Sequence, residues 1–328
     1  MRSILVTGAT GFLGKHLVEQ LRLAEPGARL RILTRSRPQS KTDPRIESIC
    51  GDVTRQEDLL RAAEGADEVY HLAGVVSRHP SECETLYRTH IEGARSVCEA
   101  VRRGTAGRAV MVSSSGTIAV GREPVAWTEE ADYKNEILAE WPYYLSKIFA
   151  EKLCLDYARR YELPIVIANP SLILGPGDDR QSSTGDIALF LEGQVMAVPR
   201  GGLNFVDARD AAAGLVAAMR RGKPGERYLL GGVNWSFREL VEHVARIAGR
   251  RAPRMQPPVS LALASARLLR RLYPLAGKSF RLDDASIKMS ALFWYCDSSK
   301  ARLELGFTTR DPEETLRDTV AYLRGPRQ

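Results

Sequence analysis

A tyrosine and a lysine stand four residues apart in the segment Tyr143-Tyr144-Leu145-Ser146-Lys147. On a helix this spacing places Tyr143 and Lys147 one above the other on the same face. A phenol with an ordinary pKa near ~10 is a poor acid–base catalyst at neutral pH, and a close ammonium favours its ionised form. The pair predicts proton transfer, although the same spacing also arises by chance.

Three consecutive serines follow an apolar run that ends at Val112. If this run is a strand of a parallel sheet, the serines lie at its carboxyl edge, where such sheets bind ligands. We select Ser115 as the hydroxyl that binds a substrate oxygen, rank Ser114 second, and assign Ser113 to a cofactor. A serine-rich turn without a catalytic role is the alternative. A serine hydrolase is excluded because the chain has no Gly-x-Ser-x-Gly elbow and no histidine in a suitable position.

Glycines connect the first apolar run to the first amphipathic segment. The spacing is G-x-x-G-x-x-G, with glycines where a tight turn, a close backbone approach and a helix–strand contact are needed. This arrangement points backbone N–H groups and the positive end of a helix at a pyrophosphate, although a purely structural turn has the same pattern. The residues assigned to the cofactor here are Gly8, Thr10, Gly11, Phe12, Leu13 and Gly14.

About twenty residues past the last glycine, a fold that binds NAD places an acidic residue on the ribose 2′-hydroxyl. This chain has Leu33-Thr34-Arg35-Ser36-Arg37 there. Arg35 can pair with the additional 2′-phosphate of NADP, so NADP(H) is preferred and NAD(H) remains possible. The alternative is that Arg35 and Arg37 are solvated cations. Asp52 and Val53 follow the third predicted strand and would bracket the adenine, unless Asp52 only caps the next helix.

The elements that must position these residues alternate through the first half of the chain. Short apolar runs and amphipathic segments of helical length predict βαβ units around a parallel sheet. We expect strands at 3–7, 29–34, 46–50, 68–72, 109–113 and 164–168, and helices at 12–23 and 143–161. Right-handed crossovers would place helices on both sheet faces, with the ligand at the carboxyl ends of the strands.

The alternation is lost after about residue 170. We expect a helix at 207–221, a strand at 227–230, a helix at 236–248, and a proline-rich linker at 253–258 that leads into further helices. The predicted fold class is therefore α/β, a doubly wound parallel sheet of Rossmann type with a smaller C-terminal substrate lobe. Residues 1–170 would bind the cofactor and carry the catalytic groups. Residues 171–328 would mainly bind substrate, with some elements returning to the first domain.

Composition limits the class of protein. The 328 residues are 44% hydrophobic, enough for a sizeable core, and the net charge of +7 is interleaved without long blocks of one sign. Nucleic-acid binding would require a basic stripe with stacking aromatics, which is missing. Five scattered cysteines indicate reduced thiols, and no metal site is expected. Without a signal peptide or a run of about 18 apolar residues, we expect a soluble cytoplasmic protein that makes no membrane contact.

These motifs together resemble those of the extended, or atypical, short-chain dehydrogenase/reductases of the NAD-dependent epimerase/dehydratase superfamily, and the resemblance runs nearly end to end. It implies a Rossmann domain, a Ser-Tyr-Lys catalytic group and nicotinamide contacts near Pro170, Ser171 and Leu172. The remaining segments that carry it are Gly51-Asp52-Val53-Thr54, Tyr70-His71-Leu72-Ala73-Gly74, Gly175-Pro176-Gly177 and Phe205-Val206-Asp207-Ala208-Arg209-Asp210. Leu72, Ala73 and Gly74 are accordingly assigned to the cofactor.

Departures from the sugar-nucleotide pattern indicate the branch. Dehydratases of the family carry an Asp-Glu pair after the catalytic hydroxyl, whereas Gly116 and Thr117 follow Ser115 here, which argues against dehydration. Leu172 stands where epimerases have an Asn for the substrate phosphate. The chain instead resembles dihydroflavonol reductase-like and hopanoid-associated epimerase-like members. A family Asn is replaced near His90, so a water relay through this position is in doubt, and His90 either substitutes for it or packs.

The leading hypothesis is an NADPH-dependent reductase of a ketone or aldehyde in a small, apolar substrate. Tyr143 would donate the proton while Ser115 holds the oxygen and Lys147 also binds the nicotinamide ribose. A sugar-nucleotide epimerase using NAD(P) ranks second, and a non-catalytic NADP-sensing protein third. The resemblance also implies a homodimer that pairs through the two long helices beside the sheet, with a monomer as the alternative.

Overall fold

A seven-stranded, fully parallel sheet forms the centre of the protein in the computed structural model, which describes residues 1–36, 43–77, 80–276 and 283–325. The strand order is β3-β2-β1-β4-β5-β6-β9. This order confirms the predicted Rossmann-type fold. The strands are β1 (Ser3–Thr7), β2 (Arg29–Thr34), β3 (Ile46–Cys50), β4 (Ala66–His71), β5 (Ala106–Val112), β6 (Ile165–Pro170) and β9 (Arg227–Leu230).

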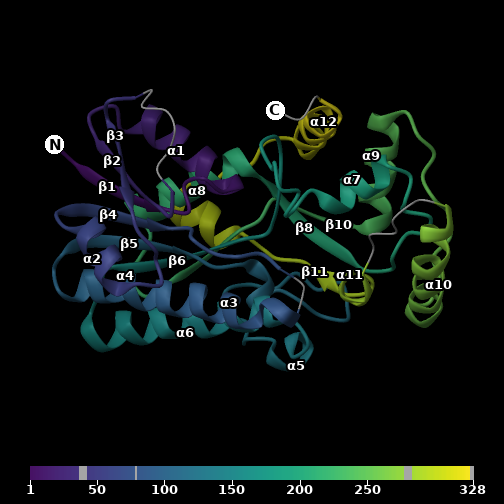
Figure 1. Ribbon diagram of the computed structural model, residues 1–328, viewed down its shortest axis with the longest axis horizontal. Helices are drawn as coiled ribbons and strands as arrows, with labels where there is room; N and C mark the ends of the chain where they lie inside the picture. The colour runs from purple at the N-terminus through teal and green to yellow at the C-terminus, as the bar shows by residue number, and fades with distance from the viewer. Residues whose placement is uncertain (37–42, 78–79, 277–282, 326–328) are drawn as a thin grey trace.

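Helices cover both faces of this sheet (Figure 1). Side chains of β1 alternate, so Ile4 and Val6 join the core under one set of helices while Leu5 joins the other. One face is covered by α1 (Phe12–Ala24) and α8 (Ala208–Arg221), which pack against each other. The other is covered by α2 (Gln56–Ala63), α4 (Gly93–Arg102) and α6 (Pro142–Tyr161).

A second, smaller sheet is built around β8 (Gly202–Asp207). It pairs with β10 (Val233–Ser236) in antiparallel and with β7 (Leu172–Leu174) and β11 (Phe293–Trp294) in parallel orientation. A single residue, Ser171, separates β6 of the central sheet from β7 of this one. The nicotinamide segment expected at 170–172 thus lies where the chain steps from one sheet to the other.

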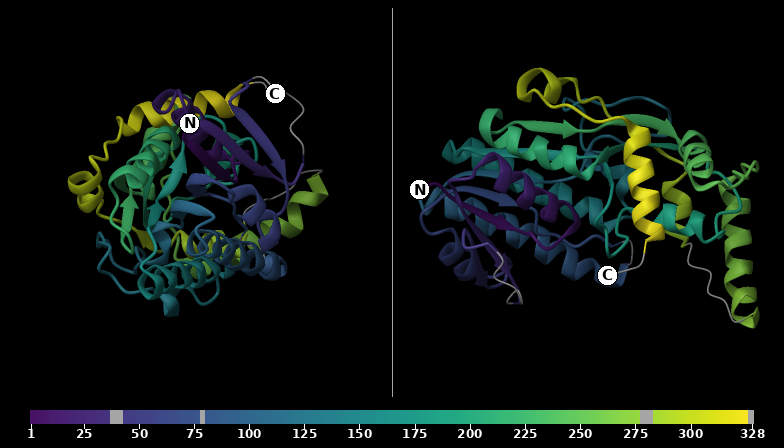
Figure 2. Two further views of the ribbon diagram at one scale, coloured as in Figure 1. Left: turned by 90° about the vertical axis from the view of Figure 1, so that its left-hand side faces the viewer. Right: turned by 90° about the horizontal axis from the view of Figure 1, so that it is seen from above.

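Helices from the second half surround the small sheet. The apolar sides of α7 (Gly185–Leu191), α9 (Phe237–Ala248) and α12 (Pro312–Arg324) form its core. Two further helices, α10 (Val259–Leu272) and α11 (Asp284–Met289), contact each other. The helix α11 lies beside β11, and α10 stands at the end of the molecule farthest from the N-terminus (Figures 1 and 2). The short helices are α3 (Cys83–Tyr87), α5 (Asn135–Leu138), the 3-10 turns 80–82, 115–117 and 273–276, and the π-turns 88–92 and 301–305.

Elements of the second half complete the central sheet. The strand β9 pairs with β6, and α8 contributes Ala211, Leu215 and Met219 to the same core as β1 and α1. Phe307, which follows the π-turn 301–305, joins that core as well. The cofactor half of the protein is therefore built from residues on both sides of position 170.

Candidate active site

The glycine turn after β1 has the geometry that a dinucleotide requires. Gly8 has a positive φ of 74°, and a Cβ there would lie 2.6 Å from the carbonyl carbon of Leu72. A Cβ at Gly14 would lie 2.1 Å from the Gly8 carbonyl oxygen, so only glycine permits this contact between α1 and the strand. Gly11 is the N-cap of α1, and in the described chain neither a capping side chain nor an acidic residue occupies its first turn. The free N–H groups there suit a pyrophosphate.

Other residues expected at the turn differ in what they offer. Thr10 and Gly11 are exposed and Phe12 is half-buried, whereas the Leu13 side chain belongs to the core, so only the Leu13 backbone remains for a ligand. Thr7 accepts a hydrogen bond from the backbone N–H of Ala73 at 3.2 Å and so ties the ends of β1 and β4 together.

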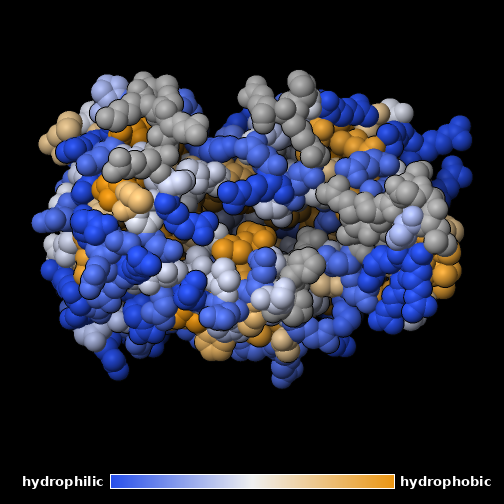
Figure 3. Space-filling model, in the orientation of Figure 1, coloured by the Kyte–Doolittle hydropathy of each residue, from blue (hydrophilic) through white to orange (hydrophobic). Residues whose placement is uncertain are grey.

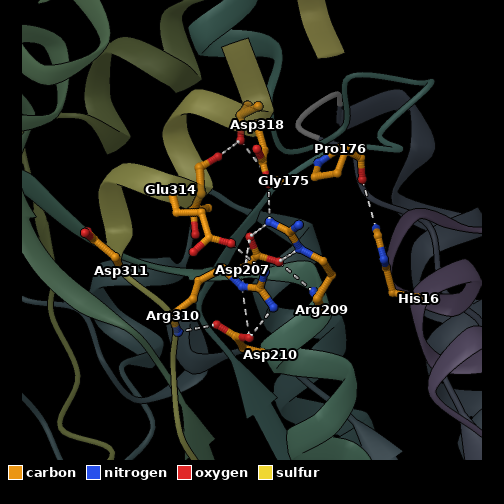
Figure 4. Close-up of polar contacts among 12 residues, drawn as sticks. His16, Gly175, Pro176, Asp207, Arg209, Asp210, Arg310, Asp311, Glu314 and Asp318 are labelled. Carbon is orange, nitrogen blue, oxygen red and sulfur yellow. Dashed lines mark hydrogen bonds and ion pairs between the residues drawn. The ribbon is translucent and has the colours of Figure 1, made fainter. Parts of the chain in front are cut away.

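A loop from the second half lies beside the first turns of α1. His16 Nε2 is 2.9 Å from the carbonyl oxygen of Pro176, and Lys15 forms an ion pair with Asp179. Figure 4 shows the contact between His16 and Pro176 beside a charged cluster that joins the start of α8 to α12. In that cluster Arg209 binds both Asp207 and Asp318, and Arg310 binds Asp210. The contacts of His16 and Lys15 hold the loop that follows β7 against the glycine turn.

Arg35 is exposed immediately after β2, next to the glycine turn in the sheet order. Within the described chain its guanidinium has no ion-pair partner. Arg37 lies outside the described residues. Asp52 Oδ1 accepts hydrogen bonds from the backbone and hydroxyl of Thr54, both at 2.9 Å, while the N-cap of α2 is Arg55. Asp52 thus caps the turn that precedes the helix.

The helix α6 brings Tyr143 and Lys147 to the carboxyl ends of β4 and β5. Lys147 Nζ donates to the carbonyl oxygen of Val112 at 2.9 Å, at the end of β5. A Cβ at Gly74 would lie 3.5 Å from the same ammonium and 3.0 Å from His90 Nε2. Gly74 therefore leaves space for a ligand beside Lys147.

The serine that hydrogen-bonds to Tyr143 is Ser114, which we ranked second to Ser115 as the catalytic hydroxyl. The Ser114 side chain hydrogen-bonds to Tyr143 and also accepts the backbone N–H of Gly116 at 3.3 Å. The strand ends at Val112, and Ser114 keeps an extended backbone as the N-cap of the 3-10 turn, while Ser115 belongs to that turn and is 5% exposed. The exact residue at which the strand gives way to the turn decides which hydroxyl faces Tyr143.

Burial shifts both titratable groups toward their neutral forms. It raises the pKa of Tyr143 to about 12, and the hydrogen bond with Ser114 acts in the opposite direction. It lowers the pKa of Lys147 to about 8, and the negative charge of Glu151 partly opposes this. At neutral pH Tyr143 therefore holds its proton, and Lys147 is a cation that titrates easily.

His90 ties three segments of the site together. Its Nε2 accepts the backbone N–H of Val75 at 3.2 Å, so its Nδ1 carries the proton and lies 2.8 Å from Ser146 Oγ. Ser146 in turn donates to the carbonyl oxygen of Tyr143 at 2.8 Å. His90 lies on a π-turn, and burial lowers its pKa to about 2, so it is neutral. Of the two roles left open for His90, these contacts favour packing and positioning.

A buried polar network beneath the site was missed by the sequence analysis. Asn169 Nδ2 donates to Glu151 Oε2 at 2.9 Å and to the carbonyl oxygen of Ser114 at 3.1 Å. Tyr133 and Arg227 also bind Glu151. One signal was available, because Glu151 follows Lys147 by four residues and so shares its helix face.

Orphaned polar atoms mark where a ligand fits. The hydroxyls of Ser113 and Ser171 and the Asn169 Oδ1 are buried and, within the described chain, have no hydrogen-bond partner. They lie at the carboxyl ends of β5 and β6, beside buried Pro170. Buried polar groups are normally paired, so a polar ligand at this edge would complete them. Together with the glycine turn they fit a dinucleotide. Figure 3 shows apolar side chains in a hollow near the middle of the face seen in Figure 1.

Comparisons with known proteins agree with this geometry. A sequence model described as the NAD dependent epimerase/dehydratase family matches residues 4–231. The chain is 34% identical to a putative dihydroflavonol 4-reductase of Synechocystis, over 97% of this chain and 94% of that one. It is 31% identical to sterol demethylase protein B of Methylococcus capsulatus, over 98% of each chain.

A solved structure shares the overall fold of the chain. The crystal structure of gox2253 superposes with a TM-score of 0.82 at 30% identity, covering 99% of this chain and 98% of that one. The family model and the similarity in overall fold agree with the Rossmann-type sheet described above. The chain belongs to the NAD-dependent epimerase/dehydratase family and is an NAD(P)-dependent oxidoreductase-type enzyme of the extended short-chain dehydrogenase/reductase group.

Proposed function

We propose that the protein is an NADPH-dependent reductase that converts a ketone or aldehyde to an alcohol. The observation that carries the proposal is the hydrogen bond between Ser114 and Tyr143, with the Lys147 ammonium on the same helix face and the glycine turn nearby. The similarity to a protein named as a dihydroflavonol 4-reductase supports the reductive direction. The missing Asp-Glu pair after the serines argues against dehydration.

The residues of the site supply binding and proton transfer. Ser114 Oγ accepts the Gly116 N–H and hydrogen-bonds to Tyr143, and in the proposed complex the Ser114 hydroxyl donates its proton to the substrate carbonyl oxygen. Tyr143 Oη, protonated at neutral pH, gives its proton to the same oxygen. Lys147 then stabilises the phenolate, which regains a proton from solvent. A bound nicotinamide would supply the hydride for the carbonyl carbon, and the backbone N–H groups of α1, Gly74 and the Ser113 and Ser171 hydroxyls would hold this cofactor.

Arg35 supports the preference for NADP(H). It is exposed at the end of β2, where a 2′-phosphate is expected, and an acidic residue is missing from that position. Its guanidinium can make charge-assisted hydrogen bonds to a phosphate. NAD(H) remains the second cofactor in this proposal.

A sugar-nucleotide epimerase is the second candidate, because the family model that matches the chain includes epimerases. Such an enzyme would use Tyr143 to oxidise and re-reduce one carbon. Leu172 in place of a phosphate-binding Asn weighs against it. The presence of Tyr143 and Lys147 on the same helix face, with Ser114 hydrogen-bonded to Tyr143, weighs against a protein that only senses NADP.

The test replaces Tyr143 with Phe and measures NADPH oxidation with a panel of ketones and aldehydes. Tyr143→Phe should abolish turnover and leave NADPH binding, followed by fluorescence, unchanged. Tyr144→Phe is the matched control, since its ring stacks on Trp294 at 4.9 Å and remains after the change. Full reductase activity of Tyr143→Phe, or interconversion of sugar nucleotides without net NADPH oxidation, would contradict the proposal.

The oligomeric state of the protein is also part of the proposal. None of the helices described is long and apolar enough to cross a membrane. We propose a homodimer through the outer side of α6, where Phe149 is 50% exposed and its ring lies 5.9 Å from that of Tyr87. Light scattering of the wild type and of Phe149→Glu measures this directly. A wild-type monomer at working concentrations would remove the proposal.

A further inference from the structure

A cavity of about 980 Å³ lies in the second half of the protein, between the small sheet and helices α7, α9, α10 and α11. Its volume is at the upper end of the range for small-molecule sites. Among the described residues that line it, Asp186 and Arg200 are the only charged ones. The walls are mostly aliphatic, and include Leu174, Ile187, Phe190, Leu240, Val244 and Ile287.

One end of this cavity adjoins the active site. Leu172 lines the cavity and is separated by one residue from Pro170 at the end of β6. On the other side, Ser290 and Ala291 line it just before β11, whose Trp294 stacks on Tyr144. The Tyr144 ring in turn meets that of Tyr143 at 5.0 Å. This end of the lining is therefore connected through Trp294 and Tyr144 to Tyr143, which donates the proton in the proposed function.

The far end of the cavity opens to solvent through an apolar rim. Four lining side chains there are large, apolar and exposed: Met196 at 49%, Met255 at 67%, Val259 at 37% and Leu261 at 56%. Exposed apolar side chains that continue into an apolar cavity mark a binding site more often than an inert surface. Val259 and Leu261 lie on α10, Met255 lies in the segment that leads into α10, and Met196 lies in the segment that follows α7. The helix α10 stands away from the central sheet (Figure 2).

We infer that this cavity binds the extended hydrocarbon body of an amphiphilic substrate of lipid size, whose carbonyl lies at the Tyr143 end. A sugar nucleotide would bring a diphosphate that needs several cations, and Arg200 is the single one on the described walls. An apolar body instead gains free energy from every methylene removed from water. The inference rests on the proposed function and makes its substrate class specific.

The experiment compares methyl ketones of increasing chain length, from butan-2-one to decan-2-one, as substrates with NADPH. Each added methylene should raise kcat/KM about threefold to fourfold, because burial of a methylene contributes about 0.8 kcal/mol. Ala262→Trp places an indole on the cavity wall and should remove this dependence on length. Ala264→Trp is the matched control, since Ala264 is exposed on the same helix and outside the lining. Ala291→Phe narrows the cavity from the α11 side if Ala262→Trp does not fold.

A binding measurement separates this inference from the proposed function. In the Tyr143→Phe variant, decan-2-one should displace the fluorescent probe 1-anilinonaphthalene-8-sulfonate from the cavity, and butan-2-one should not. Displacement that Ala262→Trp abolishes supports the cavity site even if no ketone is reduced, in which case only the proposed function fails. Equal kcat/KM for all chain lengths, absence of displacement, or the same effect from Ala264→Trp as from Ala262→Trp would overturn the inference.

Discussion

Lys147 should destabilise the folded protein at neutral pH. Burial lowers its pKa from 10.5 to about 8, which corresponds to about 3 kcal/mol at roughly 1.4 kcal/mol per pKa unit. Lys147→Met removes this cost while filling a similar volume. It also removes the hydrogen bond to Val112, whose loss costs about 1 kcal/mol. We expect the variant to be more stable than the wild type by about 2 kcal/mol at pH 7, and to be inactive.

The size of this stability advantage of Lys147→Met depends on pH. Below pH 8 the lysine is charged in both states, so the folded state bears the full cost of the buried ammonium. Between pH 8 and 10.5 the unfolded chain binds a proton that the folded chain has lost, so wild-type stability rises with pH. Above 10.5 both states are neutral and the advantage of Lys147→Met disappears.

Urea unfolding, followed by tryptophan fluorescence without cofactor, measures the difference in free energy of unfolding between Lys147→Met and the wild type at pH 7 and at pH 10. Lys152→Met is the control, since Lys152 lies on the same helix but is exposed, with its ammonium 5.0 Å from the Tyr133 ring centroid. Its loss should cost at most about 1 kcal/mol at either pH. The reasoning is refuted if Lys147→Met is less stable than the wild type at pH 7, or if its advantage is the same at pH 10.

Three further predictions concern other parts of the site. Ser114→Ala should lower kcat about 100- to 1,000-fold by removing a donor to the carbonyl oxygen, whereas Ser115→Ala should keep most of the activity. Arg35→Ala should raise the KM for NADPH about 10- to 100-fold and leave that for NADH nearly unchanged in steady-state kinetics. His90→Asn should make the free energy of unfolding less dependent on pH between 6.5 and 4.5, by up to about 1.4 kcal/mol per pH unit. In this range the His90 ring binds a proton in the unfolded chain but stays neutral in the folded protein, where burial lowers its pKa.

Each of these three predictions would be contradicted by a specific result. A larger loss of kcat in Ser115→Ala than in Ser114→Ala would restore the first choice of serine. An equal rise in the KM for NADPH and for NADH in Arg35→Ala would contradict a contact between Arg35 and the 2′-phosphate. An unchanged pH dependence in His90→Asn, measured by urea unfolding in matched buffers, would mean that His90 is protonated in the folded protein.

Much of the cofactor half could be predicted from local sequence patterns. The bounds of β1, β2 and β3 match the expected strands, because each is a short apolar run between turn residues. The glycine turn was also predicted, since its spacing reports backbone geometry directly. Both features depend on residues that are close together in the sequence.

Two kinds of feature could not be predicted: the exact residue at which a strand ends, and contacts between segments that are far apart in the sequence. The strand before the serines ends at Val112, one residue earlier than expected, and the turn then directs Ser114 to Tyr143. The network of Glu151 with Asn169 joins α6 to β6, and its partner Arg227 comes from β9. The apolar cavity combines walls from 172 to 291, so no short pattern indicates that the walls enclose a space.

The return of β9 to the central sheet has a consequence for synthesis on the ribosome. When Pro170 at the end of β6 has been made, the strand that pairs with its free edge is still 57 residues away, since β9 begins at Arg227. At about 5–20 residues per second, this gap lasts roughly 3–11 seconds. Until then one edge of β6 has no partner strand, and the apolar face that α8 later covers stays exposed until residues 208–221 have been made. Both features can contact chaperones or neighbouring nascent chains.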